Sequence, residues 1–295
     1  MAPCAARWTG FWATAMSRIA IIAAMEREVR PLIRSWKVRT NVRTLEHGGR
    51  RYRLFENGEA TLVCGGIGAE AARRATEAVI REVNPARVIS VGFAGALDGS
   101  LLVGQVLEPR TVINAADGVR TEVGSGEGIL VSSTTVAGKE QKIRLRKAYG
   151  ASAVDMEAAA VAQGAQARGV EFGALKAISD AADFSLPATD RFAADFVADD
   201  GSFHSVRFAC HVALRPWLWG TTIALARNSS RASEALCGAL ASYLSREALR
   251  HQTLPAESLD AEVNPTEVRP EFAGAHTRTG TQSHTQAEGK PSGRR

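Results

Sequence analysis

The chain has 295 residues, of which 45% are hydrophobic and 23% are charged, and its formal net charge is +5 at pH 7. This length and composition are typical of a soluble globular protein with one sizeable core. Basic residues alternate with acids rather than forming a patch, which disfavours nucleic-acid binding, and no apolar run is long enough to span a bilayer. The four cysteines form no C-x-x-C pair, so we expect neither a metal site nor a disulfide framework, and a cytoplasmic location fits.

The composition divides the chain into four regions. Residues 1–16 lack the long apolar run of a signal peptide and are expected to be a disordered extension, and Met16 is a candidate start of the protein. Residues 17–203 are expected to form one α/β domain, followed by a helical extension at 204–250. Residues 251–295 are polar with scarcely an aromatic side chain, so we expect a disordered tail.

The first half of the domain alternates strands and helices. An apolar run at residues 18–24 predicts a buried strand, and a helix is expected from there to Trp36. Residues 51–56 and 60–64 predict two strands joined by a turn at Asn57-Gly58. A glycine-rich loop then leads into a helix that ends at Val83.

The second half continues the alternation. Strands are expected at residues 87–91, 104–114, 128–133 and 172–178, and helices at 139–149 and 155–168. Such alternation indicates an α/β domain with a largely parallel sheet.

Two more helices are expected at residues 203–226 and 231–249. Packing on the domain is the favoured interpretation of their apolar residues. Contact with a membrane or a partner is the alternative, because tryptophan stands beside arginine at residues 215–219.

Acidic residues stand at the ends of two neighbouring elements. Asp155 and Glu157 lie at the entrance of an alanine-rich helix, and Asp180 and Asp183 follow an apolar strand. Asp155 and Asp183 are also candidate helix caps, whereas Glu157 and Asp180 are less easily explained in that way. Because open α/β sheets bind ligands at the carboxyl ends of their strands, the two groups are expected to face one crevice.

The loop Gly66-Ile67-Gly68-Ala69-Glu70-Ala71 matches G-x-G-x-x-A, the dinucleotide fingerprint. It does not follow the first strand of the domain, however, and no acidic residue closes a second strand at the expected distance. A nicotinamide-dependent oxidoreductase is therefore a remote alternative, and the glycine-wrapped helix start is equally suited to another ligand's oxygens.

Five motifs, in the same order along the chain, resemble the 5'-methylthioadenosine/S-adenosylhomocysteine nucleosidases of the purine nucleoside phosphorylase superfamily. They are residues 19–29 (IAIIAAMEREV), 66–68 (GIG), 92–95 (GFAG), 154–158 (VDMEA) and 177–183 (AISDAAD). The resemblance implies a three-layer α/β/α fold with a central mixed sheet, a homodimer, and hydrolysis of purine nucleosides without a cofactor or metal.

The resemblance also implies roles for particular residues. Asp180 resembles the general acid that assists departure of the purine at N7, and Glu28 the residue that activates the attacking water. Glu157 resembles the carboxylate that binds the ribose hydroxyls, and Met156 the apolar wall under the sugar. From this chemistry we expect Asp180 to be shielded from water and Glu28 to be partly wet.

Supporting groups are expected around these acids. Ser179 and Lys176 would assist Asp180, and Gly66, Phe93 and Ser133 are expected at the substrate site.

The motifs also depart from the family pattern. Phe93 replaces a serine and Lys176 an arginine, and the loss of the hydroxyl at Phe93 favours water over phosphate as the nucleophile. A purine nucleoside phosphorylase stays the alternative.

The helices at residues 204–250 resemble those of hopanoid-associated members that act on a lipid-linked adenosine such as adenosylhopane. The predicted reaction is adenine release from methylthioadenosine or adenosylhomocysteine, with the lipid-linked adenosine as a further alternative.

Overall fold

The computed structural model describes residues 18–36, 41–124, 126–184 and 219–253. The expected extension at 1–16, its candidate start at Met16, the domain boundary at 203/204 and residues 254–295 of the expected tail lie outside these ranges. The first three residues of that tail, 251–253, continue the last helix.

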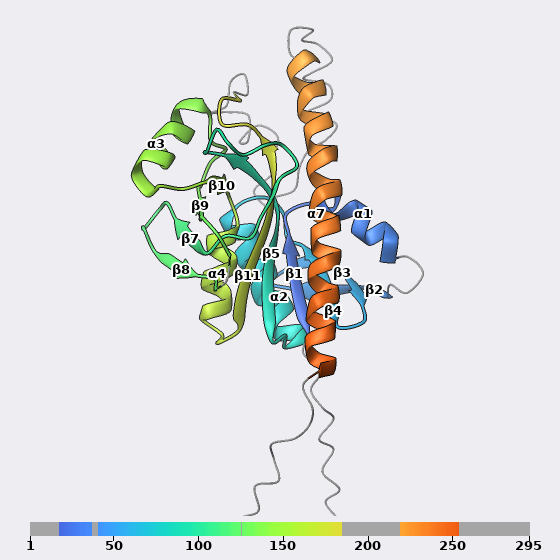
Figure 1. The fold of residues 1–295 in the computed structure, drawn as a ribbon. Coiled ribbons are helices and arrows are strands. Elements are labelled where there is room, and N and C mark those ends of the chain that lie inside the picture. Colours follow the sequence, from blue (N-terminus) through green and yellow to red (C-terminus); the bar gives the residue numbers. More distant parts are fainter. Residues whose placement is uncertain (1–17, 37–40, 125, 185–218, 254–295) are drawn as a thin grey trace, which may run out of the picture. The chain divides into compact units, whose positions relative to one another are not determined.

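Eleven strands of the described chain form one sheet (Figure 1). Their bounds are β1 Ile19–Ala23, β2 Asn41–His47, β3 Arg50–Asn57, β4 Ala60–Cys64, β5 Arg87–Ala96, β6 Val106–Leu107, β7 Thr111–Asn114, β8 Arg120–Glu122, β9 Ile129–Ser132, β10 Ala153–Asp155 and β11 Glu171–Asp180. The order is β2-β3-β4-β1-β5-β10-β9-β7-β8, and β11 pairs with β5 and β6.

The sheet is mixed. Strand β1 runs parallel to β4 and β5, β5 runs parallel to β11, and β9 runs parallel to β7 and β10. The remaining pairs are antiparallel, among them the β2-β3 and β3-β4 hairpins. The mixed sheet implied by the resemblance is confirmed, and the largely parallel sheet inferred from alternation is wrong, because hairpins supply part of the pairing.

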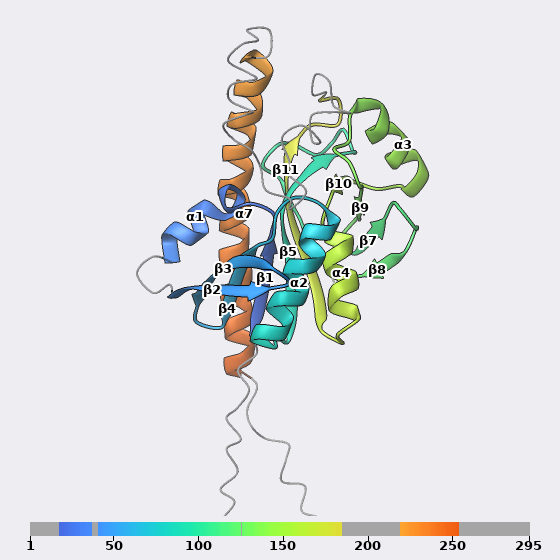
Figure 2. The same ribbon diagram turned by 180° about the vertical axis from the view of Figure 1, so that it is seen from behind.

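Helices cover both faces of this sheet (Figures 1 and 2). They are α1 Glu26–Trp36, α2 Ala69–Val83, α3 Lys139–Tyr149, α4 Ala158–Gln166 and α7 Trp219–Thr253. Side chains of β1 alternate between faces: Ile19 and Ile21 pack in a cluster with α1 and α7, whereas Ala20 and Ile22 pack with α2 and α4. The domain therefore has three layers.

Helix α7 is one continuous helix of 35 residues. Ala232, Leu236 and Leu240 are fully buried in the cluster that contains β1 and α1. The prediction of a break between two helices at residues 227–230 is wrong, because packing of α7 on the domain overrides the weak helix preference of Asn228-Ser229-Ser230. Within the described residues, no helix is both long and apolar enough to cross a membrane.

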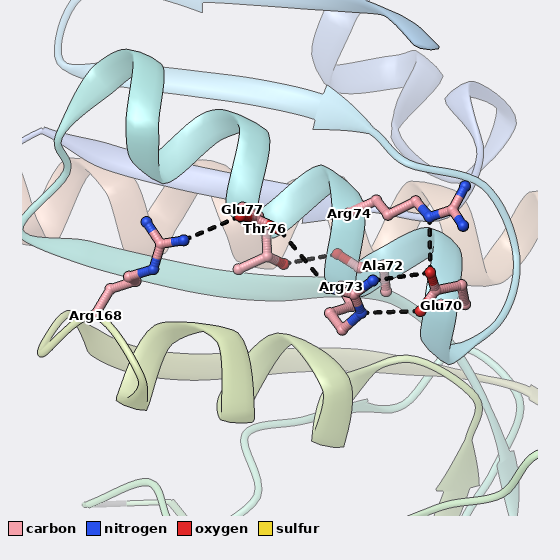
Figure 3. A network of polar contacts seen from close by, with 7 residues as sticks. All are labelled: Glu70, Ala72, Arg73, Arg74, Thr76, Glu77 and Arg168. Atoms are coloured by element: carbon pink, nitrogen blue, oxygen red, sulfur yellow. Dashed lines mark hydrogen bonds and ion pairs between the residues drawn. The ribbon is translucent and has the colours of Figure 1, made fainter. Parts of the chain in front are cut away.

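The opposite face carries surface ion pairs within α2 and one between α2 and Arg168, which follows α4 (Figure 3). Arg73 and Arg74 donate to Glu70, and Arg168 donates to Glu77 at 3.1 Å. These side chains are largely exposed, so each pair contributes at most about 1 kcal/mol. The two helices are therefore held mainly by the apolar residues beneath.

Three strands were missed from the sequence: β2, β8, which has only three residues, and β10. Strand β2 is mostly exposed and so lacks a buried alternation, although the Gly48-Gly49 turn after it has positive φ at both residues. Strand β10 has three residues and contains Asp155. The expected helix at 155–168 therefore begins only at Ala158.

Candidate active site

The structure gathers Glu28, Glu157 and Asp180 on one cavity of about 220 Å³. Glu28 lies in the helix that follows β1, Glu157 lies between β10 and α4, and Asp180 ends β11. The parallel strands β1, β5 and β11 end at the same edge of the sheet, which is where such sheets bind ligands. Residues from four separate parts of the chain are thus brought together, since Phe93 of β5 also lines the cavity.

Glu28 is buried, with only 4% of its surface exposed. Its Oε2 accepts a hydrogen bond from the backbone N–H of Met25 at 3.2 Å. Gly92 leaves room for this carboxylate, since a Cβ there would lie 3.2 Å from Glu28 Oε2. Burial raises the pKa of Glu28, while the Met25 N–H and the charge of Lys176 lower it. A carboxylate of this kind accepts protons more readily than an exposed one.

Glu157 is held at the start of α4. Its Oε1 accepts from the backbone N–H of Gly68 at 2.8 Å, and its Oε2 accepts from that of Met156 at 3.3 Å. Burial and the nearby charge of Asp155 raise the pKa of Glu157 to about 7, although Lys176 and the Gly68 N–H oppose this shift.

Lys176 forms a buried ion pair with Asp155, at 2.9 Å between Nζ and Oδ2. Its Nζ also donates to Ser90 Oγ at 3.0 Å. The negative charges of Asp155, Glu157 and Glu28 raise the pKa of Lys176 against the effect of burial. The expectation that Lys176 assists Asp180 is wrong, because its side chain is paired with Asp155 and lies near Glu157 and Glu28 instead.

Asp155 is fully satisfied by the protein. Besides Lys176 it accepts from Ser132 Oγ at 2.5 Å and from the Ala158 N–H at 2.9 Å. Asp155 therefore holds Lys176 and the start of α4 in position beside the cavity.

Asp180 is paired with a lysine that the sequence did not reveal. Lys142 Nζ donates to Asp180 Oδ2 and, at 2.7 Å, to the carbonyl of Ala181. Ser179 Oγ donates to Asp180 Oδ1 at 2.8 Å, as expected of a supporting group. Gly95 allows the carboxylate to lie against β5, since a Cβ there would be 2.8 Å from Oδ2. Lys142 belongs to α3, a helix rich in lysine and arginine, so no local pattern marked it out.

The exposures of the two proposed catalytic acids are the reverse of those expected. The Asp180 side chain is 21% exposed, whereas Glu28 is buried. The physical reason is that Asp180 stands at the open end of β11, whereas Glu28 lies in the first turn of α1 with its carboxylate against Gly92 of β5.

The remaining predicted residues divide into two groups. Met156, Phe93 and Ser179 line the cavity, as does Leu225 of α7, which the sequence did not suggest. Ser133 is buried behind it, accepting from Gln141 Nε2 at 3.0 Å.

Gly66 and its neighbours lie beside the cavity. The loop donates to the protein itself, from Gly65 to Ala23, from Gly66 to Ala24 and from Gly68 to Glu157. These donors are therefore not directed at a pyrophosphate, which argues against the dinucleotide interpretation.

Comparison with known proteins identifies the family of the chain. The family model described as "Phosphorylase superfamily" matches residues 18–134 and 123–202. A relative from Staphylococcus aureus (strain JH9), named 5'-methylthioadenosine/S-adenosylhomocysteine nucleosidase, is 28% identical over 198 residues, covering 56% of this chain and 86% of the relative.

Solved structures share the fold. The apo 5'-methylthioadenosine nucleosidase of Arabidopsis thaliana matches with a TM-score of 0.60 and 18% identity, over 78% of this chain and 96% of that one. The Helicobacter pylori 5'-methylthioadenosine/S-adenosylhomocysteine nucleosidase with butyl-thio-DADMe-Immucillin-A matches with a TM-score of 0.58 and 19% identity, over 79% and 99%. At these identities the likeness establishes the fold alone.

Proposed function

Because the chain belongs to the phosphorylase superfamily, we propose that it hydrolyses the N-glycosidic bond of a 5'-substituted adenosine and releases adenine. The observation that carries this proposal is the convergence of Glu28, Glu157 and Asp180 on a single cavity. The substrates named for the Staphylococcus aureus relative, 5'-methylthioadenosine and S-adenosylhomocysteine, are the first candidates.

The charge around the cavity suits this reaction. Cleavage of the bond between C1' and the purine builds positive charge on the ribose, and carboxylates held nearby favour that state over the neutral substrate. Burial raises the pKa of both Glu28 and Glu157. A ribosyl cation would therefore meet carboxylates that water screens only weakly.

In this proposal Glu28 and Asp180 each carry out one of the two proton transfers. Glu28 takes a proton from the attacking water as its oxygen bonds to C1', and the bond to the purine breaks. Asp180 delivers a proton to N7 of the departing base. Since the Lys142 ammonium donates to Asp180, the proton that Asp180 passes to N7 comes in this proposal from that ammonium, which is left as a neutral amine.

The sugar is positioned by the other residues of the cavity. Glu157 accepts from the ribose hydroxyls, and Met156 packs under the ring. Ser179 orients Asp180 through its hydrogen bond at 2.8 Å.

Water is the proposed nucleophile, and the bulk of Phe93 in the cavity wall supports it. A phosphorylase needs a hydroxyl and an arginine to hold phosphate near this turn, and a phenyl ring supplies neither function.

Adenine release from methylthioadenosine, measured with and without phosphate, tests the proposal. We expect adenine and the free sugar at equal rates in both buffers. Formation of a sugar 1-phosphate would instead identify a phosphorylase, and absence of adenine would overturn the proposal.

A cytoplasmic homodimer, and membrane contact through residues 204–250, stay predictions from the sequence. Burial of Leu236 and Leu240 of α7 in the core favours packing over membrane contact. Light scattering of the purified protein measures the oligomeric state, and sedimentation with vesicles measures the contact.

A further inference from the structure

A second cavity, of about 420 Å³, adjoins the first. The two share Arg27, Phe93 and Leu225 in their walls. The second cavity lies between α1 and α7, and we call it the arginine cavity. A group attached to a nucleoside in the first cavity would reach it by passing Phe93 and Leu225.

One wall of the arginine cavity is strongly basic. Arg27, Arg30 and Arg34 lie on one face of α1, at the three- and four-residue spacing that brings helical side chains together. Arg30 and Arg34 form no ion pair with any residue that the structure describes. Like charges on one helix face repel each other, so an anion bound between them would be stabilising.

The opposite wall carries hydroxyl groups. Thr222, Ser229 and Ser230 of α7 line it, together with one acid, Glu234. Guanidinium groups facing hydroxyls are suited to carboxylate and phosphate oxygens, because both donate hydrogen bonds and the arginines also supply charge. In the shared wall, Phe93 and Leu225 lie beside Arg27 and offer apolar surface to an uncharged stem.

We propose that the arginine cavity is a subsite for a negatively charged 5' substituent on the nucleoside. The inference rests on the proposed function, which puts the nucleoside in the first cavity. An aliphatic or thioether stem lies between Phe93 and Leu225, and a carboxylate at its end is bound by Arg30 and Arg34. The single acid, Glu234, suits an ammonium group beside that carboxylate.

Two substrates that differ only in the carboxylate test the subsite. They are S-adenosylhomocysteine and 5'-(3-aminopropylthio)adenosine, which has the same stem and amino group without the carboxylate. We expect the ratio of their kcat/KM values to favour S-adenosylhomocysteine and to fall about tenfold in Arg30→Met, and further in the Arg30→Met/Arg34→Met double variant. Arg81→Met, which removes an exposed arginine of α2, is the matched control and keeps the wild-type ratio.

A binding experiment separates this proposal from the proposed function. The ratio of the two dissociation constants is measured by calorimetry on the Asp180→Asn variant, in which turnover is slowed. If substitution of Arg30 and Arg34 abolishes the preference for S-adenosylhomocysteine in these dissociation constants, the subsite is supported, whether or not the wild-type protein releases adenine. Absence of adenine release would overturn only the proposed function.

Two results would overturn the subsite. The first is a ratio that the arginine substitutions leave unchanged. The second is turnover of methylthioadenosine that requires inorganic phosphate and is lost with Arg30 and Arg34, since the cavity would then hold the nucleophile.

Discussion

At the scale of single residues, one lysine stands among three carboxylates at the back of the cavity. Lys176 is paired with Asp155, and its charge also acts on Glu28 and Glu157. One cation against three acids leaves a net negative charge when all are ionised. A substrate that becomes positively charged as it reacts therefore offsets this negative charge, whereas the neutral substrate does not.

Asp180→Asn tests the proposed acid. The amide keeps the shape of the side chain but has no proton to deliver, so we expect kcat to fall by roughly 100- to 10,000-fold with nucleoside affinity retained. Adenine release measured beside calorimetric binding checks both. Asp183→Asn, three residues along and exposed, is the control and keeps the wild-type rate; a fully active Asp180→Asn enzyme would contradict the role.

Glu157 makes both stability and activity depend on pH. Because its pKa is raised from 4.5 to about 7, the folded state binds this proton more tightly than the unfolded state, and the free energy of unfolding falls as pH rises from about 4.5 to 7. Glu157→Gln removes this loss. We therefore expect the free energy of unfolding of the variant, relative to that of the wild type, to be higher at pH 8 than at pH 5 by roughly 2 kcal/mol.

Urea unfolding at pH 5 and pH 8 measures the effect. The same variant should be nearly inactive, since an amide cannot replace a carboxylate at the ribose. The exposed Glu140 of α3 provides the control Glu140→Gln, whose stability should follow the wild type at both pH values. If Glu157→Gln differs from the wild type by the same free energy of unfolding at pH 5 and at pH 8, the raised pKa of Glu157 is refuted.

At the scale of elements, α7 completes the core and also supports the site. Ser233 Oγ donates to the carbonyl of Glu28 at 2.9 Å, and Leu236 is fully buried in the cluster around β1. Helix α7 therefore holds the start of α1 in place while it closes one face of the sheet.

Two substitutions on this helix separate packing from surface effects. Leu236→Ala leaves a cavity in the core and should lower the free energy of unfolding by about 2–5 kcal/mol. Ile223→Ala, at a position 58% exposed on the same helix, should change it by less than about 0.5 kcal/mol. The midpoints of urea unfolding give both values, and similar losses for the two variants would contradict the placement of α7.

At the scale of the whole molecule, the sequence predicted the parts of the site that stand at element ends. Glu157 and Asp180 stand next to a strongly patterned helix and strand, so the edge of the sheet was expected to bring them together, whereas Glu28 was named from the family resemblance. Lys142 and Leu225 could not be found in this way. Their helices show no local feature that distinguishes a side chain directed at the cavity from one directed at solvent, and only the tertiary arrangement decides it.

The errors have the same origin. Lys176 is four residues before Asp180 in sequence, yet it pairs with Asp155 across the sheet. The relative exposures of Glu28 and Asp180 depend on how each carboxylate lies against β5, at Gly92 and Gly95, which are remote from both acids in the chain. Strand pairing and helix packing are long-range properties, whereas the motifs report local ones.

The first and last described elements, β1 with α1 and then α7, share one hydrophobic cluster. During translation, the face of the sheet that carries Ile21 is covered only by α1 until Leu240 has left the ribosome. Nascent chains stalled before that point should lack a finished site and should recruit chaperones that bind exposed apolar surface.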